Sequence, residues 1–301
     1  MARQARAKMP GAACCYHVVS RANGQEFKLD EGNMKDVFMK YLKKLTQKLF
    51  YARIVSFTCL SNHFHLVVNM LDPEDVDEKE AIKRWNEYHE KAYQRNPDFK
   101  SHREYVVKQL TDISSFIKRL KMHLTIEYNK LTETTGTMWD RRFYSGILQR
   151  GYAVAVCSAY VDLNSFRAGI VKKPEDYQYS SLHELEKGNR EDLVEVPLLA
   201  EGLDMGDFAR YLADEKTLFK KVQQTYKAFV YKAGLQPHRD EDEDEERKGL
   251  VITHEMFAKI EKEVLGIDEG IFVKRQEMFT EGKSLGSPEF AEQFYDNHIA
   301  K

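Results

Sequence analysis

The chain has 301 residues, of which 42% are hydrophobic and 31% charged, a composition that excludes fibrous and disordered proteins and leaves room for two domains. Its net charge of -2 hides an asymmetry, because residues 1–190 carry about +8 and residues 191–301 about -10. The longest apolar stretches are far shorter than the roughly 20 residues of a membrane span, and the first ten residues lack the apolar core of a signal peptide. These features predict a cytoplasmic protein with no membrane partner.

The first seventy residues read as strand, helix, strand, strand. The run CYHVVS at 15–20 predicts a short strand, and apolar residues at helical spacing over 34–49 predict an amphipathic helix whose other side carries lysines. Two β-rich runs follow, at 51–60 and 63–70. Because only Ser61 and Asn62 separate them, these runs are typical of a hairpin.

The next hundred residues add helices and one more strand. Residues 73–105 are polar and predicted to be helical, and a stripe of apolar residues from Leu110 to Leu131, at spacings of three and four, predicts the longest helix. GTMWDRRFYSGILQ at 136–149 predicts a turn leading into a strand, and 152–165 a further helix. The alternation predicts an α+β fold in which helices cover one face of a largely antiparallel sheet.

Beyond residue 190 the chain becomes acidic and helical in pattern. We therefore expect one domain over 1–190 and an acidic helical C-terminal region over 191–301, in which 236–247 is a charged linker. The four cysteines are too few and too irregularly spaced for a disulfide framework, and no CxxC pair suggests structural zinc. We expect Cys14, Cys15, Cys59 and Cys157 to be free thiols.

Two histidines interrupt the second strand of the hairpin. Alternate residues of a strand share a face, so His63 and His65 project together while Phe64 and its alternate neighbours fill the core on the opposite face. Two neutral imidazoles at this spacing can share one metal ion. The alternative is that both are ordinary, partly exposed histidines hydrogen-bonded to their neighbours.

A second group of polar residues lies in the helix predicted near residue 160. In SAYVDLNSFRAGIV at 158–171, Tyr160 and Asn164 are one helical turn apart and therefore share a face. They offer a phenol and an amide oxygen side by side.

The chain resembles a known family in five segments that occur in the family's order. The family is the single-tyrosine HUH (histidine–hydrophobic–histidine) transposases, especially the branch associated with repetitive extragenic palindromes (REP). The segments are YHVVSRANGQ at 16–25, SNHFHLVV at 61–68, MWDRRFYS at 138–145, AYVDLNSFRAGIV at 159–171 and PEDYQYSS at 174–181. The resemblance spans residues 12–185. It departs from the family in the acidic insertion at 72–105, and in LNSF, where many members have a proline after the asparagine.

The resemblance implies a ferredoxin-like HUH domain with a central antiparallel sheet, and a role for each residue of the two groups. His63 and His65 would be metal ligands, Asn164 would help to hold the metal, and Tyr160 would be the nucleophile. The family implies a divalent cation, Mg²⁺ or Mn²⁺, although imidazoles alone would also suit zinc or nickel. It also implies a single-stranded DNA hairpin as substrate, a 5′-phosphotyrosine intermediate, a monomer or homodimer, and a location at the bacterial nucleoid.

The basic half of the chain predicts where such DNA would bind. Arginines beside aromatic residues combine phosphate binding with surfaces on which unpaired bases stack, and basic residues elsewhere would follow the backbone. The candidates are Arg21, Lys118, Arg119, Lys121, Trp139, Arg141, Arg142 and Phe143. The alternatives are core packing for Trp139 and Phe143, and ordinary solvated charge for the cations.

Two other classes of function compete with a DNA strand transferase. A catalytically silent DNA-binding regulator of palindromic repeats would keep the basic surface but would not need Tyr160. A metal-dependent hydrolase could use two histidines on a strand, but the sequence shows no further His and carboxylate ligands in the order that such enzymes need.

Overall fold

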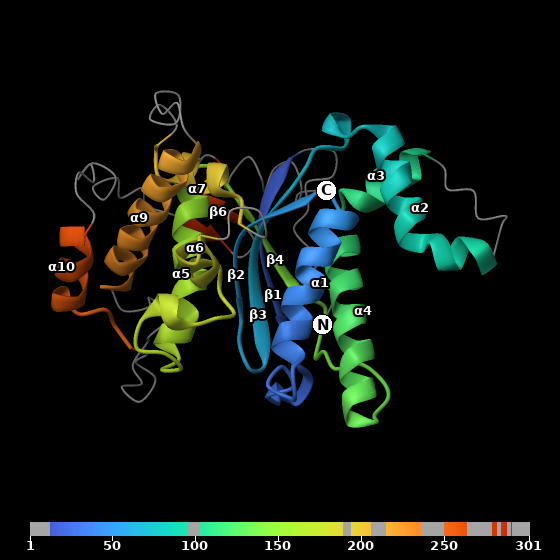
Figure 1. Cartoon of the computed structure of the whole chain (residues 1–301), viewed down its shortest axis with the longest axis horizontal. Helices are drawn as coiled ribbons and strands as arrows, with labels where there is room; N and C mark the ends of the chain where they lie inside the picture. Colours follow the sequence, from blue (N-terminus) through green and yellow to red (C-terminus); the bar gives the residue numbers. More distant parts are fainter. Residues whose placement is uncertain are drawn as a thin grey trace.

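A six-stranded sheet runs through the centre of the protein, with helices on both of its faces (Figure 1). The structure is a computed structural model, and it describes residues 13–95, 103–188, 194–205, 215–235, 250–263, 279–281, 284–287 and 290. The strands are β1 (Cys14–Arg21), β2 (Ala52–Cys59), β3 (His63–Met70), β4 (Tyr144–Leu148), β5 (Phe279–Glu281) and β6 (Ser284–Gly286).

The helices occupy the segments between these strands and follow the sequence pattern closely. They are α1 (Met34–Lys48), α2 (Glu78–Arg95), α3 (Arg103–Leu110), α4 (Ile113–Thr132), α5 (Tyr152–Arg167), α6 (Ser181–Glu186), α7 (Val196–Gly202), α9 (Glu215–Gly234) and α10 (His254–Glu263). Three short 3-10 helices lie at Asn23–Gln25, Pro73–Asp75 and Pro174–Asp176.

The first four strands form an antiparallel sheet in the order β2-β3-β1-β4. With α1 between β1 and β2, and α4 before β4, this is the ferredoxin-like arrangement of strands and helices. The predicted α+β fold with a central antiparallel sheet is confirmed. The prediction that helices cover one face of the sheet is wrong, because α5 packs on the face opposite to α1 and α4. The sheet continues beyond β4 with β6, which pairs parallel to β4, and then β5.

One face of the sheet is covered by α1 and α4. The apolar stripe of α1, which includes Phe38 and Leu42, and that of α4, which includes Leu120, are fully buried. They pack in one core with Phe64 and Leu66 of β3. Asp112 is the N-cap residue of α4, and its carboxylate accepts the backbone N–H of Ser115 at 2.7 Å.

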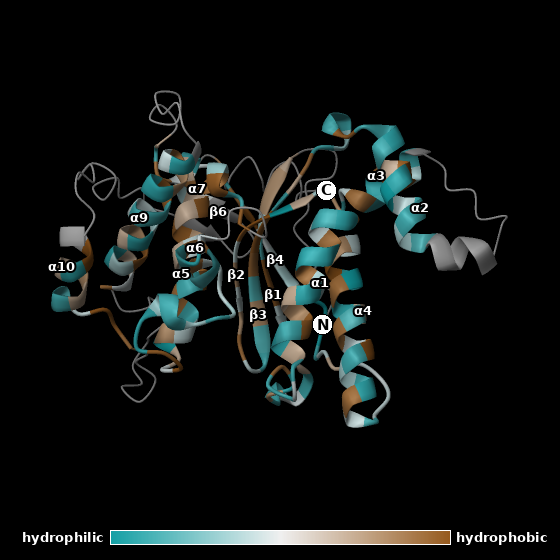
Figure 2. Cartoon of the chain, in the orientation of Figure 1, coloured by the Kyte–Doolittle hydropathy of each residue, from teal (hydrophilic) through white to brown (hydrophobic). Residues whose placement is uncertain are grey.

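The opposite face is covered by α5, which α7 and α9 cover in turn (Figures 1 and 2). Eleven residues of α5 are buried, on nearly all its sides, because the helix lies between the sheet and the outer helices. This position explains why its sequence is apolar without a strong stripe.

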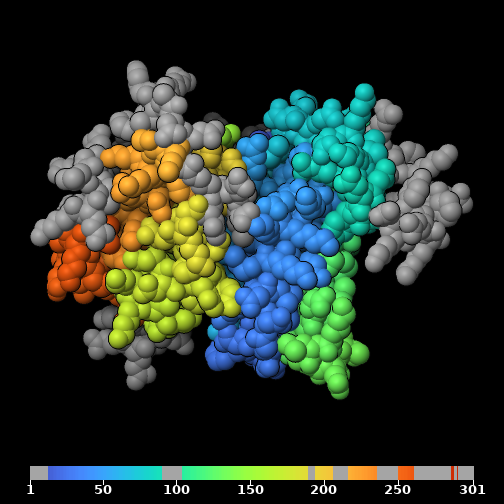
Figure 3. All heavy atoms as spheres, viewed as in Figure 1, coloured from blue at the N-terminus to red at the C-terminus, as the bar shows by residue number. Residues whose placement is uncertain are grey.

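The region after residue 190 shares this core. Tyr226 of α9 donates a hydrogen bond of 2.6 Å to the buried carboxylate of Asp162 on α5, and the atoms of α9 lie against the neighbouring helices in Figure 3. Besides the predicted helices, this region contains the strands β5 and β6, which the sequence pattern did not indicate. The boundary at residue 190 stays a prediction, and the linker at 236–247 lies outside the described residues.

All four cysteines are buried free thiols, as expected. Burial raises the pKa of the Cys14 and Cys15 thiols to about 12, so neither is a reactive thiolate near neutral pH. In the described part of the chain, no helix is both long and apolar enough to cross a membrane.

Candidate active site

His63 and His65 lie on the face of the sheet that α5 covers. They alternate along β3 with Phe64, which packs in the core on the α1 and α4 side, as the strand period requires. Their ring centroids are 5.0 Å apart. His65 is only 4% exposed, whereas His63 lies at the start of the strand and is partly exposed. The two imidazoles therefore form a pair with one open side.

A third histidine, which the sequence analysis did not single out, completes this cluster. His17 lies on β1, beside β3, and its Nε2 is 3.1 Å from Nδ1 of His65. The two rings are nearly parallel, with an angle of 15° between their planes. The signal was present in the strand CYHVVS, where His17 alternates with core residues just as His65 does on β3.

Burial holds the histidines neutral. Loss of solvent lowers the pKa of His17 and that of His63 to about 4, and for His63 the positive charge of Arg21 lowers it further. The pKa of His65 lies well below its ordinary value for the same reason, with added repulsion from His17, His63 and Arg21. Neutral imidazoles are the form that binds metal ions.

Each of His63 and His65 uses Nδ1 in a hydrogen bond, so Nε2 of each ring is available to a metal ion. Nδ1 of His63 donates to the amide oxygen of Asn62 at 2.6 Å, which leaves Nε2 of His63 unbonded within the described residues. Nε2 of His65 is likewise without a hydrogen bond there, because its contact to His17 uses Nδ1. No group of three or more His, Cys, Asp or Glu side chains in the described segments could hold a cation. A cation on His63 and His65 would therefore need an amide, a phosphate or water as its other ligands.

Tyr160 of α5 packs directly against the histidine cluster. Its ring centroid is 5.8 Å from that of His65 and 5.9 Å from that of His17, with an edge-on approach to both. The guanidinium of Arg167, two turns further along α5, lies 5.9 Å from the Tyr160 ring centroid. Arg167 was missed in the sequence, although the spacing of 160, 164 and 167 puts all three residues on one helical face.

Asn164 follows Tyr160 by one turn, as the sequence predicts, but its amide group bonds to its own helix. Its Nδ2 donates to the carbonyl oxygens of Tyr160 at 2.8 Å and Val161 at 3.4 Å. The oxygen Oδ1 has no hydrogen bond within the described residues and is the atom that could contribute to a metal site. The role of Asn164 as a ligand stays a prediction.

A second tyrosine lies at the edge of the cluster. Tyr144 of β4 is 47% exposed, and its ring meets that of His17 edge-on, with centroids 6.2 Å apart. Gly146 lies beneath it, where a Cβ would come within 2.9 Å of the Tyr144 hydroxyl oxygen. Because Gly146 has no side chain, the Tyr144 hydroxyl can lie close to its backbone.

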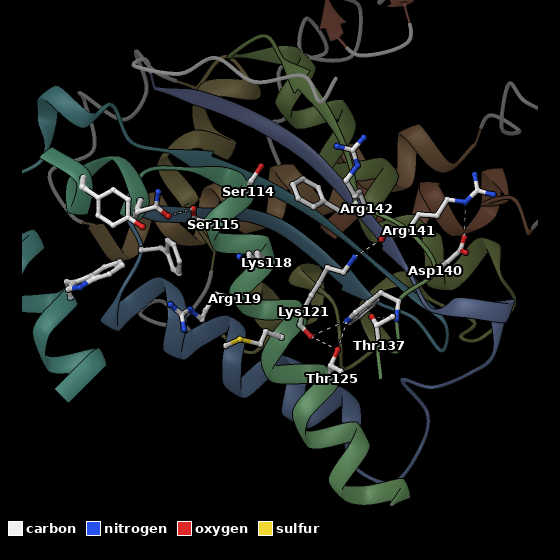
Figure 4. Close-up of a pocket in the computed structure, with 17 residues that line it drawn as sticks. Ser114, Ser115, Lys118, Arg119, Lys121, Thr125, Thr137, Asp140, Arg141 and Arg142 are labelled. Carbon is white, nitrogen blue, oxygen red and sulfur yellow. Dashed lines mark hydrogen bonds and ion pairs between the residues drawn. The ribbon is translucent and has the colours of Figure 1, made fainter. Parts of the chain in front are cut away.

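Most of the predicted DNA-binding cations meet on the other face of the sheet. Lys118, Arg119 and Lys121 of α4 line a groove of about 850 Å³ together with Arg141 and Arg142 from the segment before β4 (Figure 4). We call this the α4 groove. Lys121 donates to the carbonyl oxygen of Arg141 at 2.9 Å and so ties the two walls together.

Arg21 is the one predicted cation that lies elsewhere. It pairs with His63 across β1 and β3, on the histidine face of the sheet. Its carbonyl oxygen accepts the backbone N–H of Asp140 at 3.1 Å, so the segment carrying Arg141 and Arg142 joins the sheet at this point. The end of β1 therefore lies between the α4 groove and the histidine cluster.

Trp139 and Phe143, the predicted stacking residues, are only 5% and 6% exposed. Trp139 packs edge-on against Phe64, and its Nε1 donates to the carbonyl oxygen of Lys121 and to Oγ1 of Thr125, both at 3.1 Å. Both rings line the α4 groove, but their low exposure favours core packing, the alternative prediction from the sequence. Stacking of bases on these two rings stays a prediction that their burial does not support.

Comparison with known proteins shows a distant structural similarity. No protein-family profile and no curated protein matches this chain. A solved structure described as "Structure of the REP associates tyrosine transposase bound to a REP hairpin" is similar at a TM-score of 0.43 and 15% sequence identity. The similarity covers 62% of this chain and 86% of that one. At this low level of similarity, the chemistry of the site follows from its own geometry and not from that structure.

Proposed function

We propose that this chain is a metal-dependent single-stranded DNA endonuclease and strand transferase, a transposase-like enzyme that cuts hairpin-containing DNA through Tyr160. The observation that carries the proposal is the packing of the Tyr160 phenol against His65 and His17, at centroid distances of 5.8 and 5.9 Å. Tyr160 therefore lies beside His65, whose Nε2 is available to a metal ion and whose ring centroid is 5.0 Å from that of His63.

The proposed reaction balances without an external energy source. The Tyr160 oxygen loses its proton and forms a bond to the scissile phosphorus, while the bond from phosphorus to the 3′ oxygen breaks and that oxygen takes up a proton. The products are a 5′-phosphotyrosine and a free 3′-OH. Because one phosphodiester replaces another, the reverse attack by a 3′-OH rejoins DNA without ATP.

Residues around Tyr160 supply the charge that this chemistry needs. The Arg167 guanidinium, 5.9 Å from the ring centroid, would stabilise negative charge that develops at the reacting phosphate. Arg21, beside His63, would pair with a phosphate oxygen. A divalent cation, Mg²⁺ or Mn²⁺, on His63, His65 and Asn164 would supply Lewis-acid stabilisation of the phosphate.

The α4 groove provides a phosphate-binding surface for the same substrate. Its five cations come from α4 and from the segment before β4, and such an extended set suits a nucleic acid backbone more than an isolated anion. We propose that a folded single strand binds with part of its backbone in this groove. Chromatography with and without DNA would decide between a monomer and a homodimer.

The decisive experiment detects the covalent adduct. Wild-type protein incubated with Mn²⁺ and a labelled single-stranded hairpin should give a labelled protein band that survives denaturation, and Tyr160→Phe should give none. Tyr152→Phe, on the same helix but packed against Phe229, is the matched control and should keep the adduct. Tyr144→Phe tests the other phenol of the site and should also keep it.

Two outcomes would contradict this function. An adduct that persists in Tyr160→Phe would exclude Tyr160 as the nucleophile. Tight hairpin binding without any adduct, across the metals Mg²⁺, Mn²⁺, Zn²⁺ and Ni²⁺, would instead support the DNA-binding regulator.

A further inference from the structure

His17 lies behind His65, on the side away from the nitrogen atom that a metal ion would need. Its Nε2 approaches Nδ1 of His65 to 3.1 Å, a normal hydrogen-bond length. Nε2 of His17 cannot bind the same ion while this contact exists, because it is engaged with Nδ1 of His65. Any effect of His17 on metal binding must therefore act through His65.

The hydrogen bond between the neutral His17 and His65 rings contains a single proton. The ring that carries this proton determines whether Nε2 of His65 can bind a metal ion. If the proton is on Nδ1 of His65, then Nε2 of His65 carries a bare lone pair and can bind a cation. If it is on Nε2 of His17, then His65 carries its own proton on Nε2 and cannot bind one. The hydrogen bond and the metal site are therefore coupled.

The neighbouring ligand shows the same arrangement with a different acceptor. Nδ1 of His63 meets the amide oxygen of Asn62 at 2.6 Å, and this oxygen can only accept. His63 is thereby held with its proton on Nδ1 and its lone pair on Nε2. Each of the two imidazoles has a partner on Nδ1, and each presents the same nitrogen to the site.

The surroundings of His17 fix the orientation of its ring. Tyr160 and Tyr144 both meet it edge-on, at centroid distances of 5.9 and 6.2 Å, while His65 lies nearly parallel to it. A ring enclosed on these sides cannot turn its Nε2 away from His65 without displacing one of the tyrosines. The acceptor is therefore held in place before any metal arrives.

We propose that His17 is a positioning residue that accepts the Nδ1 proton of His65 and so holds His65 in the tautomer whose Nε2 can bind a metal ion. This inference rests on the proposed function, in which His65 is a ligand. An outer-shell partner of this kind is typically worth a factor of about 10–100 in metal affinity. His17 would thus tune the site without touching metal or DNA.

Three variants of His17 separate the hydrogen bond from the volume of the side chain. In His17→Gln the amide reaches the place of Nε2 and can still accept the proton. In His17→Asn the same amide is one bond shorter and falls short of His65. In His17→Leu the volume is similar but there is no acceptor.

The first measurement reads the tautomer directly in the metal-free protein. Nitrogen-15 NMR of the histidine rings, with His65 assigned through the loss of its signals in His65→Gln, should show Nε2 of His65 unprotonated in wild type and in His17→Gln. His17→Leu and His17→Asn should shift His65 toward the form protonated on Nε2. A wild-type His65 already protonated on Nε2 would overturn the proposal.

The second measurement is Mn²⁺ affinity, by titration of the whole chain without DNA. We expect affinity to fall about 10–100-fold in His17→Leu and His17→Asn, and to stay within about threefold of wild type in His17→Gln. Equal affinities in all three variants would refute the positioning role while leaving the metal site intact. Failure of wild type itself to bind Mn²⁺ would instead count against the proposed function, so the two failures are distinguishable.

Discussion

The Tyr160 ring lies edge-on against the His65 imidazole, with centroids 5.8 Å apart and an angle of 78° between the planes. One residue belongs to α5 and the other to β3, so their contact depends on how α5 docks on the sheet. Asp162, two residues after Tyr160, forms a buried anchor for that docking. Its carboxylate accepts hydrogen bonds from Ser181 Oγ at 2.6 Å, the Leu182 backbone at 3.0 Å and Tyr226 Oη at 2.6 Å.

Replacing the anchor should therefore destabilise the whole α5 side of the protein. In Asp162→Ala, three buried donors lose their acceptor, and we expect the free energy of unfolding to fall by about 2–4 kcal/mol. Urea unfolding followed by circular dichroism measures this change. Ser165→Ala on the same helix is the control, because the buried Ser165 hydroxyl has no hydrogen-bond partner in the described structure. Equal effects of the two substitutions would show that Asp162 is no anchor.

The imidazole pair on β3 should determine metal binding. We expect His63→Ala and His65→Ala each to weaken Mn²⁺ binding by more than the roughly 10–100-fold typical of an outer-shell partner, because each variant lacks a ligand nitrogen. Calorimetric titration of the folded protein gives the affinities. His254→Ala, at an exposed position on α10, should bind Mn²⁺ as wild type does. Unchanged affinity in both β3 variants would remove the two histidines from the metal site.

The α4 groove should contribute to DNA affinity through charge. In the double variant Lys118→Gln, Arg142→Gln, two phosphate contacts disappear, so the dependence of log affinity on log salt should become shallower by about 2. Fluorescence anisotropy with a hairpin at several salt concentrations measures the slope. Lys130→Gln changes a cation of α4 that lies outside the groove and pairs with Glu127. If Lys130→Gln changes the slope as much per charge as the double variant does, the α4 groove is not a preferred DNA-binding surface.

Trp139 allows core packing to be distinguished from base stacking. Trp139→Phe keeps a ring in the core but removes the Nε1 donor to Lys121 and Thr125, which should cost about 1 kcal/mol of stability. DNA affinity should stay unchanged, because the indole is buried. Thermal unfolding and anisotropy give the two quantities. A tenfold loss of affinity at unchanged stability would favour a stacking role instead.

His123 should make stability depend on pH. It stacks on Tyr41 and bonds to Tyr88, and loss of solvent, reinforced by Arg119 and Lys44, lowers its pKa to about 4. In the unfolded chain His123 takes up a proton near pH 6.5. In the folded protein it is protonated only near pH 4. Its contribution is therefore present above pH 6.5 and lost as the pH falls toward 4.

The variant His123→Gln isolates this effect, because an amide does not titrate. Between pH 7 and pH 5, wild type should lose about 1 kcal/mol more stability than the variant, once the half-buried position is allowed for. Urea unfolding at both pH values measures the difference. If the two proteins lose the same amount, the ring is accessible to protons in the folded state.

Local pattern was sufficient to predict most of the fold. The apolar stripe of α4 and the hairpin of β2 and β3 follow from the 3.6-residue and two-residue periods, which neighbouring residues alone determine. The common face of His63 and His65, and that of Tyr160 and Asn164, follow in the same way. The β5 and β6 strands could not be predicted, because three-residue strands have too few residues to show a period.

By itself, the sequence determined the order of the elements, the face on which each side chain projects, and the residue types available for metal and phosphate chemistry. Only the tertiary structure decided that His17 reaches His65 and that α5 brings Tyr160 to both. It also decided that the α4 groove and the histidine cluster lie on opposite faces of one sheet, and that Trp139 is buried. These are contacts between residues far apart in the chain, and they depend on how the layers pack, which no local period encodes.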